Sequence, residues 1–64
     1  MPIIKIDLWA GRNDELKEKL ISNITKTVCD TLGCPPEAVE VVITDIPKSN
    51  WGIAGVPASK REIK

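Results

Sequence analysis

The residue best suited to chemistry in this sequence is the proline at position 2. If Met1 is removed, Pro2 becomes a free secondary amine, and a free α-amine has a reference pKa of about 7.7 to 8.0, which burial or cationic neighbours lower. Such an amine is a base near neutral pH. The alternative is that Pro2 simply begins a strand. At the first position of a strand, the missing N–H of proline costs the sheet no hydrogen bond.

Other common catalytic groups do not compete with this proline. The 64 residues contain no histidine, and therefore no Ser/His/Asp set, and they contain no Gly-rich phosphate loop. The carboxylates at positions 14, 15 and 18 are typical of a solvated helix face. Cys29 and Cys34 lack the further cysteine or histidine pair of a structural zinc site, so we expect no metal. They are either two small, partly buried thiols or a disulfide.

Composition limits the partners and the location. Nine basic and nine acidic residues cancel and are scattered along the chain, and two tryptophans are the only aromatic residues. Neither a nucleic-acid footprint nor a membrane-binding surface is indicated. No signal peptide or long apolar segment is visible, so we expect a cytoplasmic protein with reduced cysteines.

The spacing of apolar residues predicts three main elements that must position Pro2. Residues 2–9 alternate as a strand, and residues 38–46 do the same. Between them an amphipathic helix of about five turns begins after Asn13 as N-cap and ends at Gly33, followed by a proline pair. The tail predicts a loop and a small hairpin, with a helical turn within 58–62. The whole is expected to be one α/β (α+β) domain, residues 1–64, built on a β-α-β unit.

The packing of this unit predicts self-association. The helix would cover the face made by Ile4, Ile6, Leu8, Val39, Val41 and Ile43. The opposite face carries apolar residues too, including Ile3, Trp9, Val42 and Ile46, and a two-stranded sheet has two open edges. The simplest cover is further copies of the chain. Lys5 and Glu40 lie on that second face, near an interface or a pocket.

Four segments together resemble the 4-oxalocrotonate tautomerase family. They are MPIIKIDL at 1–8, AGRNDELK at 10–17, EVVITDI at 40–46 and NWGIAG at 50–55. The resemblance spans nearly the full chain without gaps. It implies a β-α-β subunit, antiparallel dimers with a four-stranded sheet and a hexamer built as a trimer of dimers. It also implies removal of Met1, no cofactor and a small carboxylate-bearing substrate, often from aromatic compound degradation.

The resemblance also assigns roles to three residues. Pro2 matches the amino-terminal proline that acts as general acid and base. Arg12 matches the arginine that binds a substrate carboxylate and is contributed by a neighbouring subunit. Trp51 stands where an aromatic residue lines the pocket beside the proline; an interface anchor is its structural alternative.

Two residues depart from the family pattern. Glu40 replaces a second arginine that helps to polarise the substrate, and a carboxylate there repels a dianion and raises the pKa of the proline. A monocarboxylate enol is then the more natural substrate than 2-hydroxymuconate. The alternative is that Glu40 pairs with Lys5 across the strands. Trp9 replaces a smaller aliphatic residue and either narrows the pocket or fills an interface.

The sequence therefore predicts an isomerase, a cofactor-free keto–enol tautomerase that acts on 2-hydroxy-2,4-dienoates or enolpyruvates through Pro2. Two alternatives remain. One is a non-catalytic oligomeric binding or structural protein of the same fold, for which Glu40 is the best argument. The other is a related hydratase or dehalogenase, which would need polar residues that activate water.

Overall fold

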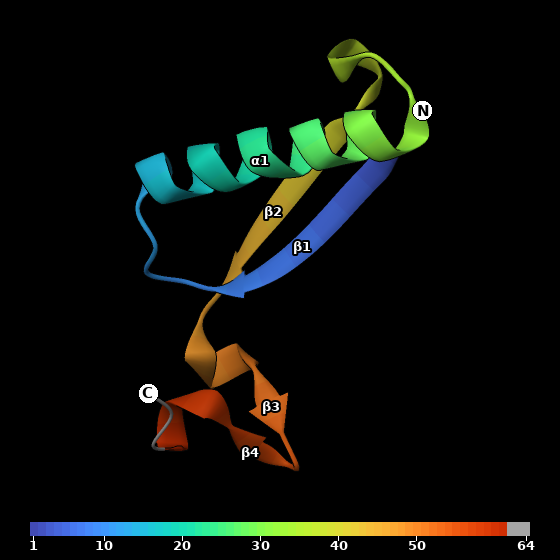
Figure 1. Cartoon of the computed structure of the whole chain (residues 1–64). Coiled ribbons are helices and arrows are strands. Elements are labelled where there is room, and N and C mark those ends of the chain that lie inside the picture. The colour runs from blue at the N-terminus through green and yellow to red at the C-terminus, as the bar shows by residue number, and fades with distance from the viewer. Residues whose placement is uncertain (62–64) are drawn as a thin grey trace.

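The two long strands form a parallel pair with the helix laid across one face. In the computed structural model, which describes residues 1–61, strand β1 spans Ile3–Trp9, helix α1 spans Asp14–Leu32 and strand β2 spans Glu40–Ile46. β1 and β2 pair in parallel, in a register that runs from Ile3 opposite Glu40 to Trp9 opposite Ile46. Figure 1 shows α1 in front of this sheet. The predicted β-α-β arrangement is confirmed.

The ends of α1 follow from two residues that the sequence indicated. The Asn13 side chain accepts a hydrogen bond of 2.8 Å from the backbone N–H of Leu16, and Asp14 and Glu15 lie in the first turn, where the helix dipole favours negative charge. At the other end Gly33 adopts φ 73°, a left-handed conformation, and its N–H donates to the carbonyl of Cys29 at 2.9 Å. Both predicted caps are confirmed.

The second strand starts later than predicted. The alternation predicts that residues 38 and 39 belong to it, but Pro36–Ala38 forms a short 3-10 helix, named η1. The Val39 N–H bonds back to the carbonyl of Pro36 at 3.1 Å, so it does not pair with β1. The ladder begins one residue later, where the Glu40 N–H donates to the Pro2 carbonyl at 3.0 Å.

The C-terminal tail forms the expected small hairpin. Strands β3, Gly52–Ile53, and β4, Val56–Pro57, pair antiparallel, and the two residues between them, Ala54 and Gly55, have φ values of 52° and 81°. Positive φ at both central positions is the geometry of a type I′ hairpin turn. A 3-10 turn at Ala58–Lys60 follows, within the predicted 58–62; residue 62 lies outside the described residues. Figure 1 shows this hairpin beyond the carboxyl ends of β1 and β2.

Burial is incomplete within one protomer. The apolar strand residues that face α1 are half-buried, in agreement with the predicted cover, whereas Ile3 and Val42 on the opposite face are exposed, at 57 % and 48 %. Three apolar residues of the helix are also exposed: Leu16, Ile21 and Leu32. Among residues 1–61, only Ala58 is an almost fully buried apolar residue, at 2 % exposure. The apolar surface therefore exceeds what one helix and one hairpin cover.

Candidate functional site

A cluster of four side chains lies where β1 ends. Trp9 closes β1, and Gly11, with φ 121°, turns the chain toward the helix. Arg12 follows this turn, and its Nη1 donates a hydrogen bond of 3.1 Å to the carbonyl oxygen of Trp9. Trp51 and Lys48, which lie in or next to the 3-10 helix η2, Lys48–Asn50, also reach Trp9. We call Trp9, Arg12, Lys48 and Trp51 the tryptophan corner.

The two indoles of the tryptophan corner meet edge to face. Their ring centroids are 6.0 Å apart and their planes are 79° from parallel, an arrangement that the ring quadrupoles favour. Trp51 is fixed by its backbone, because its carbonyl accepts a hydrogen bond of 2.7 Å from the N–H of Ala58. The Nε1 donor of Trp9 is buried and has no acceptor among the described residues. The corner thus presents aromatic surface with one polar group, the Trp9 Nε1, that residues 1–61 leave unsatisfied.

Lys48 was not among the residues singled out from the sequence. Its Nζ lies 4.9 Å from the centroid of the Trp9 ring, within the range of a cation–π contact. The only hint in the sequence is that Lys48 stands three residues before Trp51, after a proline that starts a turn. That hint places Lys48 near Trp51, but it does not predict the contact between Lys48 and the ring of Trp9, which lies 39 positions earlier in the sequence.

Arg12 also borders a small hollow between α1 and β1. The hollow has a volume of about 200 Å³ and is lined by Leu8, Arg12, Leu16, Lys17 and Leu20. Lys17 already forms an ion pair, since its Nζ lies 2.8 Å from a carboxylate oxygen of Asp45 on β2. That ion pair raises the pKa of Lys17 above its ordinary value. Arg12 forms no ion pair with a carboxylate of residues 1–61, so its charge is free for a ligand.

Pro2 lies at the opposite end of the sheet from the tryptophan corner. Seven residue steps separate Pro2 from Trp9, and an extended strand rises about 3.3 Å per residue, so roughly 23 Å of strand lies between them. Figure 1 shows the N-terminus near the carboxyl end of α1 and the hairpin at the other end. One protomer therefore brings Trp9, Arg12 and Trp51 together, and it brings Pro2 to Glu40, but it does not join the two groups.

Glu40 lies beside Pro2 through the backbone, and its side chain belongs to the exposed face of the sheet. The alternative that Glu40 pairs with Lys5 has no support in one protomer. Lys5 lies opposite Val42 and Glu40 opposite Ile3, and no ion pair joins the two charged residues within the described chain.

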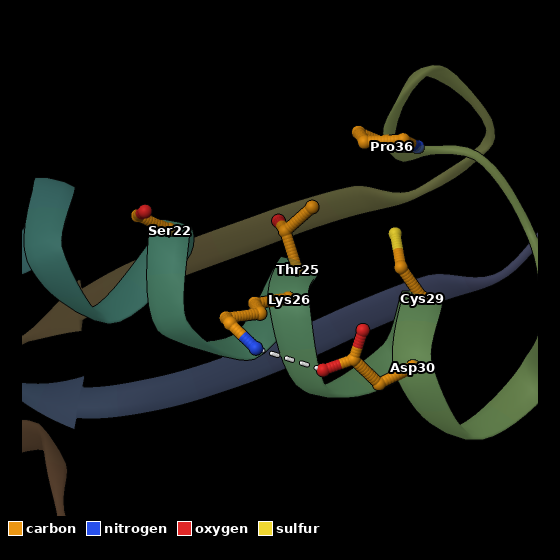
Figure 2. A pocket seen from close by; sticks show the side chains of 6 residues that line it. All are labelled: Ser22, Thr25, Lys26, Cys29, Asp30 and Pro36. Carbon is orange, nitrogen blue, oxygen red and sulfur yellow. Dashed lines mark hydrogen bonds and ion pairs between the residues drawn. The ribbon is translucent and has the colours of Figure 1, made fainter.

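A second, larger hollow than the one beside Arg12 is separate from all of these residues. This groove has a volume of about 550 Å³ and lies along α1. Figure 2 shows the side chains that line it: Ser22, Thr25, Lys26, Cys29, Asp30 and Pro36. Lys26 and Asp30 form an ion pair of 2.9 Å along its rim, and the sulfur of Cys29 points toward the segment that carries Pro36. No predicted site residue lines it. Within residues 1–61 there is also no group of three or more side chains placed to bind a metal ion.

The thiols of Cys29 and Cys34 are free, and both residues are half-buried. Burial and, next, the neighbouring Cys34 raise the pKa of Cys29, so its thiol stays protonated at neutral pH. No helix of residues 1–61 has the length and apolar character needed to cross a membrane.

Comparisons with known proteins agree on one family. Residues 2–61 match the family model described as tautomerase enzyme. The chain is 46 % identical over 59 residues to a probable tautomerase of Ralstonia nicotianae, covering 92 % of this chain and 84 % of that protein. It is 45 % identical over 60 residues to a 2-hydroxymuconate tautomerase of Pseudomonas sp. strain CF600, covering 94 % and 95 % of the two chains.

The fold has a close counterpart among solved structures. A 4-oxalocrotonate tautomerase isozyme from Methylibium petroleiphilum superposes with a TM-score of 0.86 at 43 % identity, over 91 % of this chain and 94 % of that one. The similarity therefore extends from the sequence to the arrangement of α1, β1 and β2.

Proposed function

Because this chain belongs to the tautomerase family and is an isomerase of the 4-oxalocrotonate tautomerase type, we propose that it is a cofactor-free keto–enol tautomerase that uses Pro2 as general acid and base. The observation that carries this proposal is the tryptophan corner, which joins Arg12 to Trp51 through Trp9. A guanidinium that forms no ion pair within residues 1–61, next to two indole rings, suits a planar, conjugated acid.

The active amine requires removal of Met1. Met1 is 85 % exposed, so a processing enzyme can reach it, whereas Pro2 is half-buried against the start of the sheet. Once Met1 is removed, the nitrogen of Pro2 is a secondary amine. The carbonyl oxygen of the same residue still accepts the hydrogen bond from the backbone N–H of Glu40. The strand ladder therefore fixes the amine in place.

The reaction needs only proton transfers. Arg12 binds the carboxylate of a 2-hydroxy-2,4-dienoate or an enolpyruvate. The neutral amine of Pro2 takes the proton of the enol hydroxyl, and the prolinium then gives a proton to the carbon at the far end of the conjugated system, which leaves a ketone. Each step conserves charge and atoms, and the amine returns to its neutral form. A single positioned acid–base group contributes about 10² to 10⁴-fold to such a rate.

This mechanism requires more than one protomer. Pro2 and the tryptophan corner lie at opposite ends of one chain, so the amine of one protomer must meet Arg12 and Trp51 of a neighbour. The exposed apolar residues supply the surfaces for such an assembly: Ile3 and Val42 on the open face of the sheet, and Leu16, Ile21 and Leu32 on the helix. We propose the family arrangement, antiparallel dimers with a four-stranded sheet that form a hexamer in the cytoplasm, with a role in aromatic compound degradation.

The test is an ultraviolet assay of the mature chain with phenylenolpyruvate and 2-hydroxymuconate, after mass spectrometry has shown that Met1 is absent. We expect Pro2→Ala to lower kcat by at least about 100-fold. Pro35→Ala, in the loop after α1, is the matched control and should keep its activity. Full activity of Pro2→Ala would refute the assignment of the base.

The same assay separates the alternatives. A binding or structural protein of this fold would assemble normally and show no turnover above the rate in buffer. A hydratase or dehalogenase would give a hydrated or dehalogenated product when offered the corresponding unsaturated or halogenated acid, which mass analysis of the products distinguishes from an isomer.

A further inference from the structure

Lys48 is held on the tryptophan corner by its backbone and by its side chain. Its carbonyl accepts a hydrogen bond of 3.2 Å from the N–H of Trp51, which closes the 3-10 turn of η2. Its Nζ lies 4.9 Å from the ring centroid of Trp9, whose indole also packs against Trp51. Lys48 therefore shares its two aromatic neighbours with the predicted site.

The ammonium of Lys48 is available to an anion. Lys17 and Lys26 are bound by the carboxylates of Asp45 and Asp30, whereas Lys48 forms no ion pair with an acid of residues 1–61. The acid closest to the end of β2, Asp45, is occupied by Lys17 on the side of the sheet that faces α1. Asp7 lies on the same face of β1 as Trp9, and it too is not paired with Lys48.

The cation–π contact with Trp9 orients the Lys48 side chain and leaves the N–H donors of its ammonium available. A cation–π contact at an exposed ammonium is weaker than a charge-assisted hydrogen bond with a carboxylate. An anionic oxygen that enters the corner can therefore take an N–H of the ammonium while the indole continues to restrict the side chain. The two cations of the corner would then act on the ligand together, with Arg12 held on the Trp9 carbonyl and Lys48 on the Trp9 ring.

We propose that Lys48 is a further substrate-binding residue that determines specificity, by binding a second anionic group of the substrate whose first carboxylate is bound by Arg12. Trp9 is then a positioning residue that acts through both cations. The inference rests on the proposed function, because it takes the tryptophan corner as the place where the substrate binds.

The position of Glu40 is consistent with this division of charge. Glu40 is hydrogen-bonded to Pro2, at the other end of the protomer from Lys48. In a site made by two protomers, Glu40 would lie on the side of Pro2, and the two cations, Arg12 and Lys48, would lie on the side of the tryptophan corner. The anionic groups of a substrate would bind at the corner and its uncharged carbon skeleton would lie toward Pro2.

The test compares two substrates of different charge. Steady-state kinetics of Lys48→Met and wild type are measured with 2-hydroxymuconate, which has two carboxylates, and with phenylenolpyruvate, which has one. We expect KM for the dicarboxylate to rise about 10- to 100-fold, the loss expected for a hydrogen bond to a charged group. KM for the monocarboxylate should change by less than about threefold. Lys48→Arg keeps the positive charge, so its KM for the dicarboxylate should stay close to that of wild type.

Two variants distinguish the role of Lys48 from a general loss of charge or structure. Lys19→Met removes an exposed lysine of α1 and should leave both KM values unchanged. Trp9→Phe keeps an aromatic ring next to the Lys48 ammonium, so its KM for the dicarboxylate should lie between the values of wild type and Lys48→Met. Circular dichroism checks that this variant is folded. Equal KM changes with both substrates, or none, would overturn the inference, as would a wild type that accepts only the monocarboxylate. Failure of the proposed function has another signature, namely a Pro2→Ala variant that stays fully active.

Discussion

The backbone N–H of Glu40 donates a hydrogen bond of 3.0 Å to the carbonyl oxygen of Pro2, one residue before the paired strands begin. The residue that departs most from the family pattern is therefore hydrogen-bonded, through its backbone, to the residue that carries the proposed base. In any assembly of this chain, each Pro2 has the Glu40 of its own protomer as a neighbour. The effect of this acid on the base can be measured with a single substitution.

Glu40→Gln should increase activity on an anionic substrate. Loss of the negative charge lowers the pKa of the Pro2 amine, because a nearby carboxylate favours the charged prolinium. The acid limb of the kcat/KM profile should then move to lower pH. We expect kcat/KM for 2-hydroxymuconate at pH 7 to rise about three- to tenfold, which corresponds to roughly 0.7 to 1.4 kcal/mol. Glu37→Gln, an exposed acid in η1, is the control, and superimposable pH profiles for Glu40→Gln and wild type would contradict the prediction.

Val42→Lys should separate the protomers. Val42 is 48 % exposed on the sheet face that α1 does not cover, and a lysine there would place a charge in the proposed interface. Activity should disappear with the assembly, since Pro2 and Arg12 of one chain lie too far apart to act together. Sedimentation analysis measures the size of the particle, and Asn23→Lys on the exposed side of α1 is the control. An active variant of wild-type size would show that this face is not an interface.

Cys29 should react slowly with iodoacetamide at pH 7.5. Burial and the adjacent Cys34 raise its pKa from the ordinary value of 9.0, and only the thiolate is alkylated. Its rate should therefore continue to increase above pH 9. In Cys34→Ser the pKa of Cys29 falls, so alkylation at pH 8.5 should be severalfold faster in the folded protein, as followed by peptide mass analysis. The unfolded chains of both proteins should react at the same rate, which tests whether the fold causes the difference.

The sequence predicts the elements well because their signals are local. The apolar spacing of the helix, Asn13 before it and Gly33 after it are enough to place α1, and alternation places the strands. β2 begins two residues later than the alternation predicts, because the turn at Pro36–Ala38 depends on hydrogen bonds that alternation does not reveal. Ala38, the last residue of that turn, and Val39 are both apolar and lead directly into the strand, so the sequence pattern does not mark where the turn ends.

The candidate site is only partly accessible from sequence. Arg12 and Trp51 come from the resemblance, and the structure adds that both contact Trp9, which the sequence marks only as an unusual residue. Lys48 was missed because its contact with Trp9 depends on the turn after β2 and on packing between distant segments. The separation of Pro2 from the tryptophan corner follows from strand length, and it gives a physical reason for expecting a site shared between protomers.

The edge-to-face pair of Trp9 and Trp51 also has a spectroscopic consequence. These are the only aromatic residues of the chain, so all of its intrinsic fluorescence arises from a single location, beside Arg12 and Lys48. With ring centroids 6.0 Å apart, the indoles exchange excitation energy, and the ammonium over one of them perturbs its emission. The protein thus carries an unmodified optical reporter in the place where we expect substrate, and ligand binding can be followed without any label.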